Sequence, residues 1–483
     1  MSVEALEEIL HPQSVAVVGA SANTRSWGYS YTHHLIEYGF RGKIYPVNPN
    51  HPEILGIKTY SSLKDVPGTV DYVISCIPAG DVPKMLTECV QKQVKVVHLY
   101  TARFSETGRR DAAELERAVL GQARKAGIRL IGPNCMGVYH PKHGLSFGYD
   151  LAKEPGPVGM LSQTGGGASG FVRQAARRGI RFSKVISYGN ALDLNECDYL
   201  EYFAWDPETS VIVIYIEGPR DGRKFFDMLR RVALQKPVII VKGGRGEAGT
   251  RSTASHTASL AGSMSAWEAL VAQTGAVPAV NLDEVADLAI SFCLLPPLKG
   301  PRVGIAGGGG GPSVLSADEC EEAGLEIVPL PAEIRHELKD RGVEIWDWIG
   351  NPVDASIIGG FGVDILDMLR LMALNENFDL LIGLINESVM LTLSLQDGVS
   401  ERLKMTVEGY RRLKEEKLKP LLAVIGDDCS GSDEYGDWSG RLISDVRTNL
   451  IAAGIPFYPT IGRAANAARK VLDYYMHKDT GTG

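Results

Sequence analysis

The chain has 483 residues, of which 44% are hydrophobic and 22% are charged, and its formal net charge at pH 7 is −8. This length predicts about three domains of ordinary size, and the composition excludes disordered, fibrous and membrane-spanning classes. Because the charge is acidic and no Lys/Arg cluster is present, nucleic acid is disfavoured as the main ligand and a small-molecule substrate is expected.

The N-terminus and the cysteines indicate the compartment that we expect. Residues 1–14 are acidic and lack the basic and apolar regions of a secretory signal. The longest apolar runs, such as Val211 to Ile216, are far below the roughly 20 residues of a membrane-spanning helix. The seven cysteines are scattered without a C-x-x-C pair, so neither disulfides nor structural zinc are expected. We expect a cytoplasmic protein without membrane contact and without a metal site of its own.

Short Val- and Ile-rich runs alternate with amphipathic segments, which predicts parallel strands joined by helices. The first series opens with a strand at 14–18, a glycine turn and a helix from about residue 27 to 38. Further strands are expected at 43–47, 71–77, 94–100 and 128–132. These elements predict a doubly wound, Rossmann-like nucleotide-binding domain over residues 1–150.

Two Pro/Gly-rich stretches, at 153–157 and 294–302, separate two further series of the same kind. Strands are expected in the second series at 157–162, 183–187, 210–216 and 236–244, and in the third at 303–307, 325–330, 379–385 and 420–426. The fold class is therefore α/β, with three consecutive doubly wound domains at 1–150, 151–295 and 296–475 and a polar tail at 476–483.

The first glycine turn has the form of an anion site, because Gly19 and Ser21 lie between a strand and a helix. It is not G-x-G-x-x-G, and the second strand ends in Pro46-Val47-Asn48-Pro49-Asn50 without an acid to hold a ribose. This disfavours a nicotinamide dinucleotide and favours an elongated phosphorylated ligand such as coenzyme A. A purely structural strand-to-helix turn is the alternative.

One histidine, His256, lies in a run of small and hydroxylated residues, TRSTASHTASLAG at 250–262. The run offers little apolar surface to bury, so we interpret it as a loop that presents an imidazole. The alternative is a hydroxyl-rich turn with a locally bonded histidine. Lys242, Arg245 and Arg251 flank the run and either screen phosphate or are solvated surface charges.

The segment PVGMLSQTGGGASGF predicts a second anion site. Leu161 is expected to end a strand and Ala168 to begin a helix, which leaves the amides of residues 163–167 unencumbered by bulky side chains. A phosphoryl group at such a helix start is stabilised by the dipole and by N–H donors. A tight glycine connection is the structural alternative.

Taken together, several segments resemble the alpha subunit of ADP-forming (NDP-forming) acyl-CoA synthetases and, more distantly, that of succinyl-CoA synthetase. They are VAVVGAS, GFRGKIYPVNPN, IGPNCMGV at 131–138, GMLSQTGG at 159–166, SVIVIYIEGPRDGRKF at 210–225, KPVIIVKGGRGEAGTRSTASHTASLAG at 236–262 and GNPVD at 350–354. The resemblance implies a CoA-binding first domain followed by two flavodoxin-like domains.

The resemblance also implies roles for single residues. His256 would carry phosphate as phosphohistidine and Glu217 would orient it, although a helix-capping or exposed-loop glutamate is the alternative for Glu217. The residues implied to line the coenzyme A site are Gly19, Ala20, Ser21, Ala22, Asn48, Pro49, Asn50, Tyr100, Thr101 and Ala102. Those implied to border the acyl group and phosphate are Asn134, Ser162, Gln163, Thr164, Gly165, Gly166 and Gly167.

The implied reaction is the reversible conversion of a small carboxylic acid, CoA and ATP to acyl-CoA, ADP and phosphate. The chain shows no P-loop and no ATP-grasp ligand set, so ATP/ADP and Mg²⁺ are expected on a separate ATP-grasp beta subunit. It departs from the family where Ala191 replaces a lysine and where five glycines occupy 307–311. The alternative is a catalytically inactive CoA-binding or acyl-CoA-sensing protein, and a nicotinamide oxidoreductase is weaker still.

Overall fold

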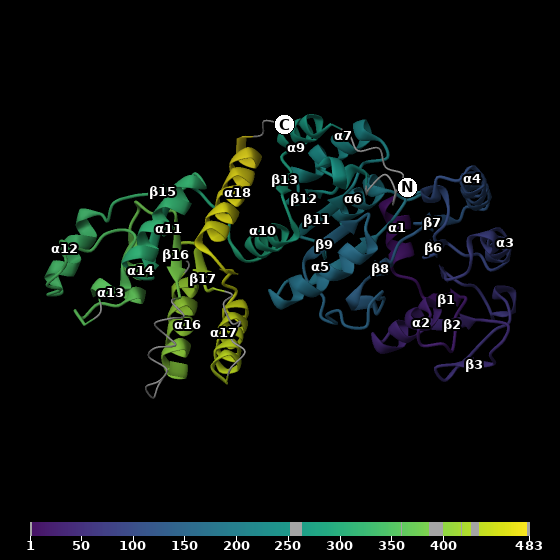
Figure 1. Ribbon diagram of the computed structural model, residues 1–483, viewed down its shortest axis with the longest axis horizontal. Helices are drawn as coiled ribbons and strands as arrows, with labels where there is room; N and C mark the ends of the chain where they lie inside the picture. Colours follow the sequence, from purple (N-terminus) through teal and green to yellow (C-terminus); the bar gives the residue numbers. More distant parts are fainter. Residues whose placement is uncertain are drawn as a thin grey trace. The chain divides into compact units, whose positions relative to one another are not determined.

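The computed structural model describes residues 2–251, 263–358, 360–385, 399–416, 418–426 and 434–480. They form two compact units, one up to residue 285 and one from residue 286 onward. The strands form three sheets of five or six strands, two in the first unit and one in the second (Figure 1), and one further two-stranded sheet in the first unit. No helix within the described ranges is both long and apolar enough to cross a bilayer.

The first sheet is fully parallel in the order β2-β1-β5-β6-β7. Its strands are β1 (Ser14–Val18), β2 (Lys43–Val47), β5 (Tyr72–Ser75), β6 (Val96–Leu99) and β7 (Arg129–Ile131), with a separate β3 (Glu53–Ile54) and β4 (Ile57–Lys58) hairpin. The helices are α1 (Val3–Leu10), α2 (Trp27–Glu37), α3 (Val82–Gln91) and α4 (Arg110–Lys125), and the 3₁₀ turns are η1 (Leu63–Asp65), η2 (Ala79–Asp81), η3 (Ser105–Thr107) and η4 (Pro141–His143). Strand order reverses between β1 and β5, where such sheets bind ligands at their carboxyl edge.

The second sheet has the order β13-β12-β11-β9-β10-β8. Its strands are β8 (Gly137–Tyr139), β9 (Val158–Ser162), β10 (Phe182–Ser187), β11 (Val211–Ile216), β12 (Val238–Lys242) and β13 (Val277–Ala279). The helices are α5 (Gly165–Arg177), α6 (Glu196–Trp205), α7 (Gly222–Ala233), α9 (Met264–Thr274) and α10 (Leu282–Leu294), the last of which crosses into the second unit. Only β8 runs antiparallel, against β10. The order reverses between β9 and β11, so the residues after these two strands meet at a second switch point.

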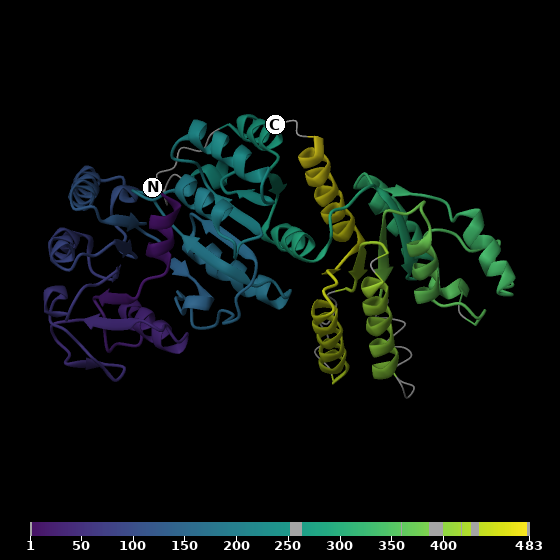
Figure 2. The same cartoon turned by 180° about the vertical axis from the view of Figure 1, so that it is seen from behind.

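The third sheet is parallel in the order β15-β14-β16-β17-β18. Its strands are β14 (Arg302–Gly307), β15 (Glu326–Ile327), β16 (Leu380–Leu384), β17 (Leu421–Val424) and β18 (Phe457–Tyr458). The helices are α11 (Gly310–Glu322), α12 (Ala332–Asp340), α13 (Ala355–Ile358), α14 (Ile365–Leu374), α16 (Val399–Glu415), α17 (Glu434–Ala452) and α18 (Ile461–Thr480). Helices α16 and α17 lie side by side, as Figure 2 shows from behind, while α11 packs against α18.

The α/β fold class predicted from the sequence is confirmed, and every predicted strand is present within a few residues of its expected bounds. Central strands such as β11 are buried along almost their whole length, because helices cover both faces of a parallel sheet. The boundaries near 150, 295 and 475 stay predictions. Strand β8 lies before the first of them and nevertheless pairs with the second sheet.

Candidate functional site

A cavity of about 890 Å³ opens at the carboxyl edge of the first sheet. Its wall includes six of the residues expected at the CoA or phosphate sites, which are Tyr100, Thr101, Ala102, Asn134, Gly165 and Gly166. The first four follow strands β6 and β7, and the two glycines begin helix α5 of the second sheet. One space is therefore shared by residues that the sequence assigned to two different ligands.

The first glycine turn lies next to this cavity. Gly19 has a φ of +88°, and a Cβ there would lie 2.8 Å from the carbonyl oxygen of Cys76, a residue of the cavity wall. Such a left-handed conformation and close approach require glycine. The Asn48 side chain donates to the carbonyl oxygen of Ala20 at 2.6 Å. This hydrogen bond joins the turn at 19–22 to the turn at 48–50. Neither turn contributes a residue to the wall of the cavity in the described part of the chain.

The second glycine turn begins one helix turn earlier than expected. Strand β9 includes Ser162, and α5 begins at Gly165, so the prediction that Ala168 begins the helix is wrong. Thr164 caps the helix by accepting from the Gly167 N–H at 3.4 Å. Such a cap offsets the low helix propensity of glycine. Because Gly165 and Gly166 line the cavity, the positive end of the α5 dipole faces it.

Two side chains of the expected phosphate site, those of Ser162 and Gln163, form hydrogen bonds with the backbone. The Ser162 hydroxyl accepts from the Thr164 N–H at 3.2 Å and donates to its carbonyl oxygen at 2.7 Å. The Gln163 amide, 5% exposed, accepts from the backbone N–H groups of Glu217 and Gly218 and donates to the Gly218 carbonyl at 3.0 Å. The Ser162 side chain therefore stabilises its own turn, and the Gln163 side chain holds the backbone at residues 217 and 218.

Glu217 follows β11 at the second switch point and is 7% exposed. It does not cap the next helix, because Asp221 is the N-cap of α7. Its Oε1 lies 3.5 Å from the hydroxyl of Tyr215, and burial together with this carboxylate raises the pKa of Tyr215 to about 12. Both the exposed-loop and the helix-cap interpretations of Glu217 are thereby excluded.

Lys242 is also buried, which excludes the solvated surface charge that was one of its two interpretations. Its ammonium donates at 2.6 Å to the carbonyl oxygens of both Glu217 and Gly243. Burial lowers the pKa of Lys242, and the nearby Glu217 carboxylate partly opposes that shift. The cation thus fixes the backbone that carries Glu217. His256, the expected phosphate carrier, lies outside the described residues.

The Asn134 side chain donates to Oδ1 of Asn190 at 3.5 Å, which links the cavity wall to the segment that contains Ala191. Asn134 has a left-handed φ of +58°, and its backbone N–H donates to the Thr101 carbonyl at 3.0 Å. The Arg220 side chain donates to the carbonyl oxygens of Asn190 and, at 3.2 Å, Ala191. The Arg220 guanidinium, for which the sequence motifs predicted no role, therefore contacts this segment.

The sequence analysis also missed part of the cavity wall. Arg103 supplies positive charge, Arg109 lines the wall in an ion pair with Asp111, and the loop Cys76 to Gly80 after β5 supplies backbone. The position of β5 beside the topological switch point was a signal that could have identified this loop. The two arginines had no signal of their own, because isolated surface arginines are common.

Known families and proteins match this chain over more than half of its length. Residues 13–141 match a family model described as a CoA binding domain, and residues 155–292 match one described as a succinyl-CoA ligase like flavodoxin domain. The chain is 39% identical, over 78% of its own length and 82% of the relative's, to the acetate–CoA ligase [ADP-forming] II subunit alpha of Pyrococcus furiosus.

Two further proteins extend the comparison. The acetate–CoA ligase [ADP-forming] I of Archaeoglobus fulgidus is 35% identical over 80% of this chain, which spans only 56% of that longer protein. A solved structure of the dinucleotide forming acetyl-coenzyme A synthetase 1 of Candidatus Korarchaeum cryptofilum, in complex with phosphate and ADP, has a TM-score of 0.80 and 29% identity. It covers 98% of this chain and is itself 97% covered. The chain belongs to the family of ADP-forming acyl-CoA ligases, as the motifs in its sequence predict.

Proposed function

We propose that this chain is the CoA- and phosphate-binding part of an ADP-forming acyl-CoA synthetase, which interconverts carboxylate, CoA and ATP with acyl-CoA, ADP and phosphate. One observation carries the proposal: the start of helix α5 and the loops after β5, β6 and β7 line a single cavity. A phosphate bound by the amides of Gly165 and Gly166 would share that space with an acyl thioester. The phosphate attacks the thioester carbonyl only when the two groups are bound this close together.

The residues present fit coenzyme A. The cavity is large enough to take part of an elongated ligand, and Arg103 supplies charge for its phosphates, whereas Arg109 is paired with Asp111 of the same wall. Position 80 has open space where a Cβ would lie, so this part of the wall leaves room for a ligand to approach the backbone. When bound there, CoA supplies the thiol that forms the thioester.

The phosphoryl steps are proposed to involve His256 and Glu217. In the energy-yielding direction phosphate attacks the thioester carbonyl, the CoA thiolate leaves and an acyl phosphate forms. A neutral imidazole of His256 then attacks phosphorus, and the carboxylate leaves. Glu217, a buried carboxylate at a switch point, would accept the other ring N–H and stabilise the cation that forms.

We also propose an ATP-grasp partner, as a separate beta subunit or a fused region, that binds ATP/ADP and Mg²⁺. The longer A. fulgidus relative supports such an additional part, since this chain spans 56% of its length. We place the reaction in the cytoplasm, because the six cysteines in the described part of the chain are free thiols.

Co-expression of this chain with an ATP-grasp subunit encoded by a neighbouring gene tests the proposal. The purified complex should release ADP from ATP only with CoA and a matching acid, which a screen of carboxylic acids identifies. It should also form an acid-labile, base-stable phosphoenzyme from labelled ATP. Label that is retained in His256→Ala would contradict the phosphohistidine step, and stabilisation by CoA without turnover on any acid would favour an acyl-CoA sensor instead.

Glu217→Gln tests whether the Glu217 carboxylate orients the His256 imidazole, since glutamine has nearly the same shape and should leave the fold intact. We expect about a 10²- to 10⁴-fold slower phosphoenzyme formation, because the partner of the imidazole is lost. The control, Glu268→Gln, changes an exposed carboxylate of the same unit and should leave the rate unchanged. Equal rates in both variants would remove Glu217 from the mechanism.

A further inference from the structure

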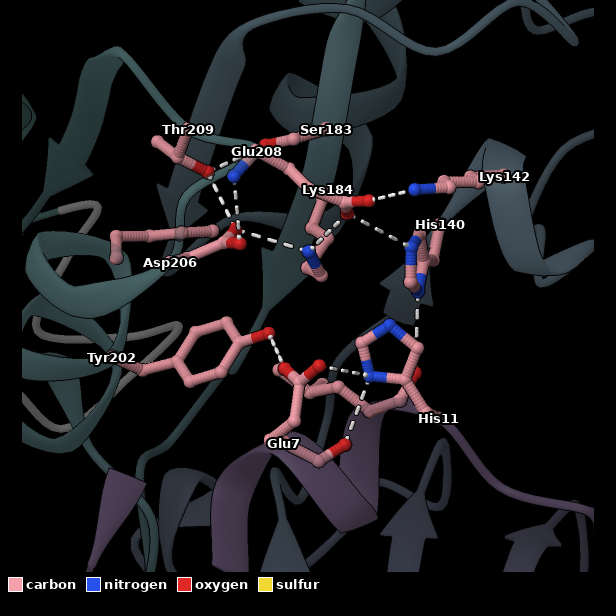
Figure 3. A network of polar contacts seen from close by, with 12 residues as sticks. Glu7, His11, His140, Lys142, Ser183, Lys184, Tyr202, Asp206, Glu208 and Thr209 are labelled. Atoms are coloured by element: carbon pink, nitrogen blue, oxygen red, sulfur yellow. Dashed lines mark hydrogen bonds and ion pairs between the residues drawn. The ribbon is translucent and has the colours of Figure 1, made fainter. Parts of the chain in front are cut away.

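A group of possible metal ligands lies in the first unit, among elements that do not line the cavity. His11 follows helix α1, His140 follows strand β8, and Glu208 lies between α6 and β11. One ligand atom from each residue lies within 4.8 Å of the others. Figure 3 shows the three side chains arranged around a common space.

His140 presents a lone pair to this space. Its side chain is fully buried, and its Nδ1 lies 3.2 Å from the carbonyl oxygen of Leu10. Because a carbonyl only accepts, Nδ1 carries the hydrogen and Nε2 carries the lone pair. Nε2 has no hydrogen-bond partner among the described residues and lies 3.8 Å from Oε2 of Glu208. Two electron-pair donors thus face each other, of which the imidazole is fully buried and the carboxylate is 28% exposed.

His11 is held in the same way. Its Nδ1 lies 2.9 Å from the carbonyl oxygen of Glu7 and 3.2 Å from the Glu7 carboxylate, and both of these groups are acceptors. Nδ1 therefore carries the hydrogen, and the other ring nitrogen is directed toward the space that His140 faces (Figure 3). A histidine that donates one N–H to a carbonyl or carboxylate and leaves its second nitrogen unprotonated is arranged as metal-binding histidines are.

We propose that His11, His140 and Glu208 bind one divalent transition-metal ion, with Zn²⁺ the best match to two imidazoles and one carboxylate. Oxygen-seeking Mg²⁺ and Ca²⁺ are disfavoured by the nitrogen ligands. Tetrahedral ligands at bonds of about 2.0–2.1 Å lie about 3.3 Å from one another, so the three groups need to move inward by about 1 Å. Sequence analysis expected no zinc because it searched for cysteine pairs.

The neighbouring charges limit the affinity. The ammonium of Lys184 lies 2.8 Å from Oε2 of Glu208 and 3.0 Å from Oδ2 of Asp206, and Lys142 contacts Oε1 of Glu208. The Lys142 side chain is 64% exposed and is able to turn to solvent, while Lys184 retains Asp206 when the metal takes Glu208. The Glu7 carboxylate lies near Nδ1 of His11, the ring nitrogen that is not proposed to bind the metal.

The location indicates a structural role. Helix α1 packs against α6, and the Tyr202 hydroxyl of α6 donates to the Glu7 carboxylate of α1. A metal bound by His11, His140 and Glu208 would join the N-terminal helix to β8 and to the loop after α6. It would stabilise the first unit without contact with the cavity.

Metal titration of the tag-free, chelator-treated full chain tests this proposal. Calorimetry and elemental analysis after gel filtration should give one Zn²⁺ per chain with a raised Tm, and no binding of Mg²⁺. Co²⁺ should give the visible spectrum of a tetrahedral site with nitrogen ligands. The absence of saturable binding, or a Co²⁺ spectrum of the hydrated ion only, would overturn the proposal.

Matched variants locate the site. His11→Gln and Glu208→Gln should each weaken Zn²⁺ binding at least about tenfold. His33→Gln removes a histidine of a surface His–Glu pair, 3.6 Å apart on α2, and should bind Zn²⁺ as the wild type does. Thermal stabilisation by CoA, which concerns the separate cavity, shows that each variant is folded. Unchanged Zn²⁺ affinity in folded His11→Gln and Glu208→Gln would place the metal elsewhere and reject this site.

Discussion

The amide of Gln163 holds the backbone of Glu217 in place. Gln163 Oε1 accepts from the N–H of Glu217 and, at 3.1 Å, from that of Gly218, while Nε2 donates to the Gly218 carbonyl at 3.0 Å. The two residues follow adjacent strands, β9 and β11, at the switch point of the second sheet. A side chain from the proposed phosphate turn thus positions the proposed orienting carboxylate.

Replacing Gln163 by leucine should therefore affect both stability and turnover. The change removes the hydrogen bonds that the Gln163 amide makes with the backbone of residues 217 and 218, which costs about 1–3 kcal/mol of unfolding free energy. Phosphoenzyme formation should slow, because Glu217 is no longer fixed. Urea unfolding and labelled-ATP kinetics measure the two effects.

The control is Gln91→Leu, which alters an exposed glutamine at the end of α3. It should change the unfolding free energy by no more than about 0.5 kcal/mol. A Gln163→Leu protein as stable as this control would contradict the role of the amide.

Two glycines of helix α5 allow an effect on helix stability to be distinguished from an effect on phosphate binding. A Cβ at Gly166 or at Gly170 would meet no described atom within 4 Å, but only Gly166 lines the cavity. Each change to alanine should stabilise the helix by up to about 1 kcal/mol. Gly166→Ala should raise the KM for phosphate several-fold, since its methyl group enters the proposed anion site.

Gly170→Ala should keep the wild-type KM for phosphate while it raises the Tm in the same way. Thermal unfolding and initial rates in the acyl-CoA-consuming direction check both variants. An unchanged KM in Gly166→Ala would argue against phosphate binding at the start of α5.

His98 makes the first unit sensitive to acid. It is 1% exposed, and burial lowers its pKa to about 4, although a hydrogen bond to the Cys135 carbonyl partly opposes the shift. The unfolded chain binds this proton near pH 6.5, whereas the folded chain does not. The contribution of neutral His98 is therefore present above pH 6.5 and is lost as the pH falls toward 4.

We expect the unfolding free energy to fall by up to about 1.4 kcal/mol per pH unit in this window on account of His98. His98→Gln should have a shallower pH dependence than wild type in urea titrations between pH 7 and 4.5. Gln91→Leu, which changes an exposed residue that does not titrate, should retain the wild-type slope. Parallel curves for wild type and His98→Gln would contradict the prediction.

Lys184 is a fully buried cation whose removal leaves a buried carboxylate unpaired. Its ammonium lies 3.0 Å from Asp206, which is 2% exposed. Lys184→Met should destabilise the first unit by about 3–5 kcal/mol, as for other broken buried ion pairs. Urea unfolding in the presence of a chelator measures this value without any metal contribution.

Lys142→Met provides the comparison, because Lys142 contacts the same Glu208 from an exposed position. It should cost no more than about 1 kcal/mol. Equal losses in the two lysine variants would mean that burial does not govern this network.

Much of the fold was predictable from local sequence. Strands such as β1, β9 and β11 appear as continuous Val- and Ile-rich runs because parallel strands are buried on both faces. The short strands β8, β13 and β18 were missed, since two or three residues carry too little pattern and β13 contains a proline. The start of α5 was placed too late, because a capped glycine helix has weak local propensity.

The sequence by itself determined the α/β class, the order of strands and turns, and the residues that follow each strand, because these depend on local periodicity and turn chemistry. Only the tertiary structure decided which of these residues meet. It gave Gln163 the backbone of Glu217 as its partner, brought Arg103 and Arg109 into the cavity wall, and gathered His11, His140 and Glu208. These contacts join residues that are far apart in the sequence and are brought together by long crossover connections, so no local sequence pattern predicts them.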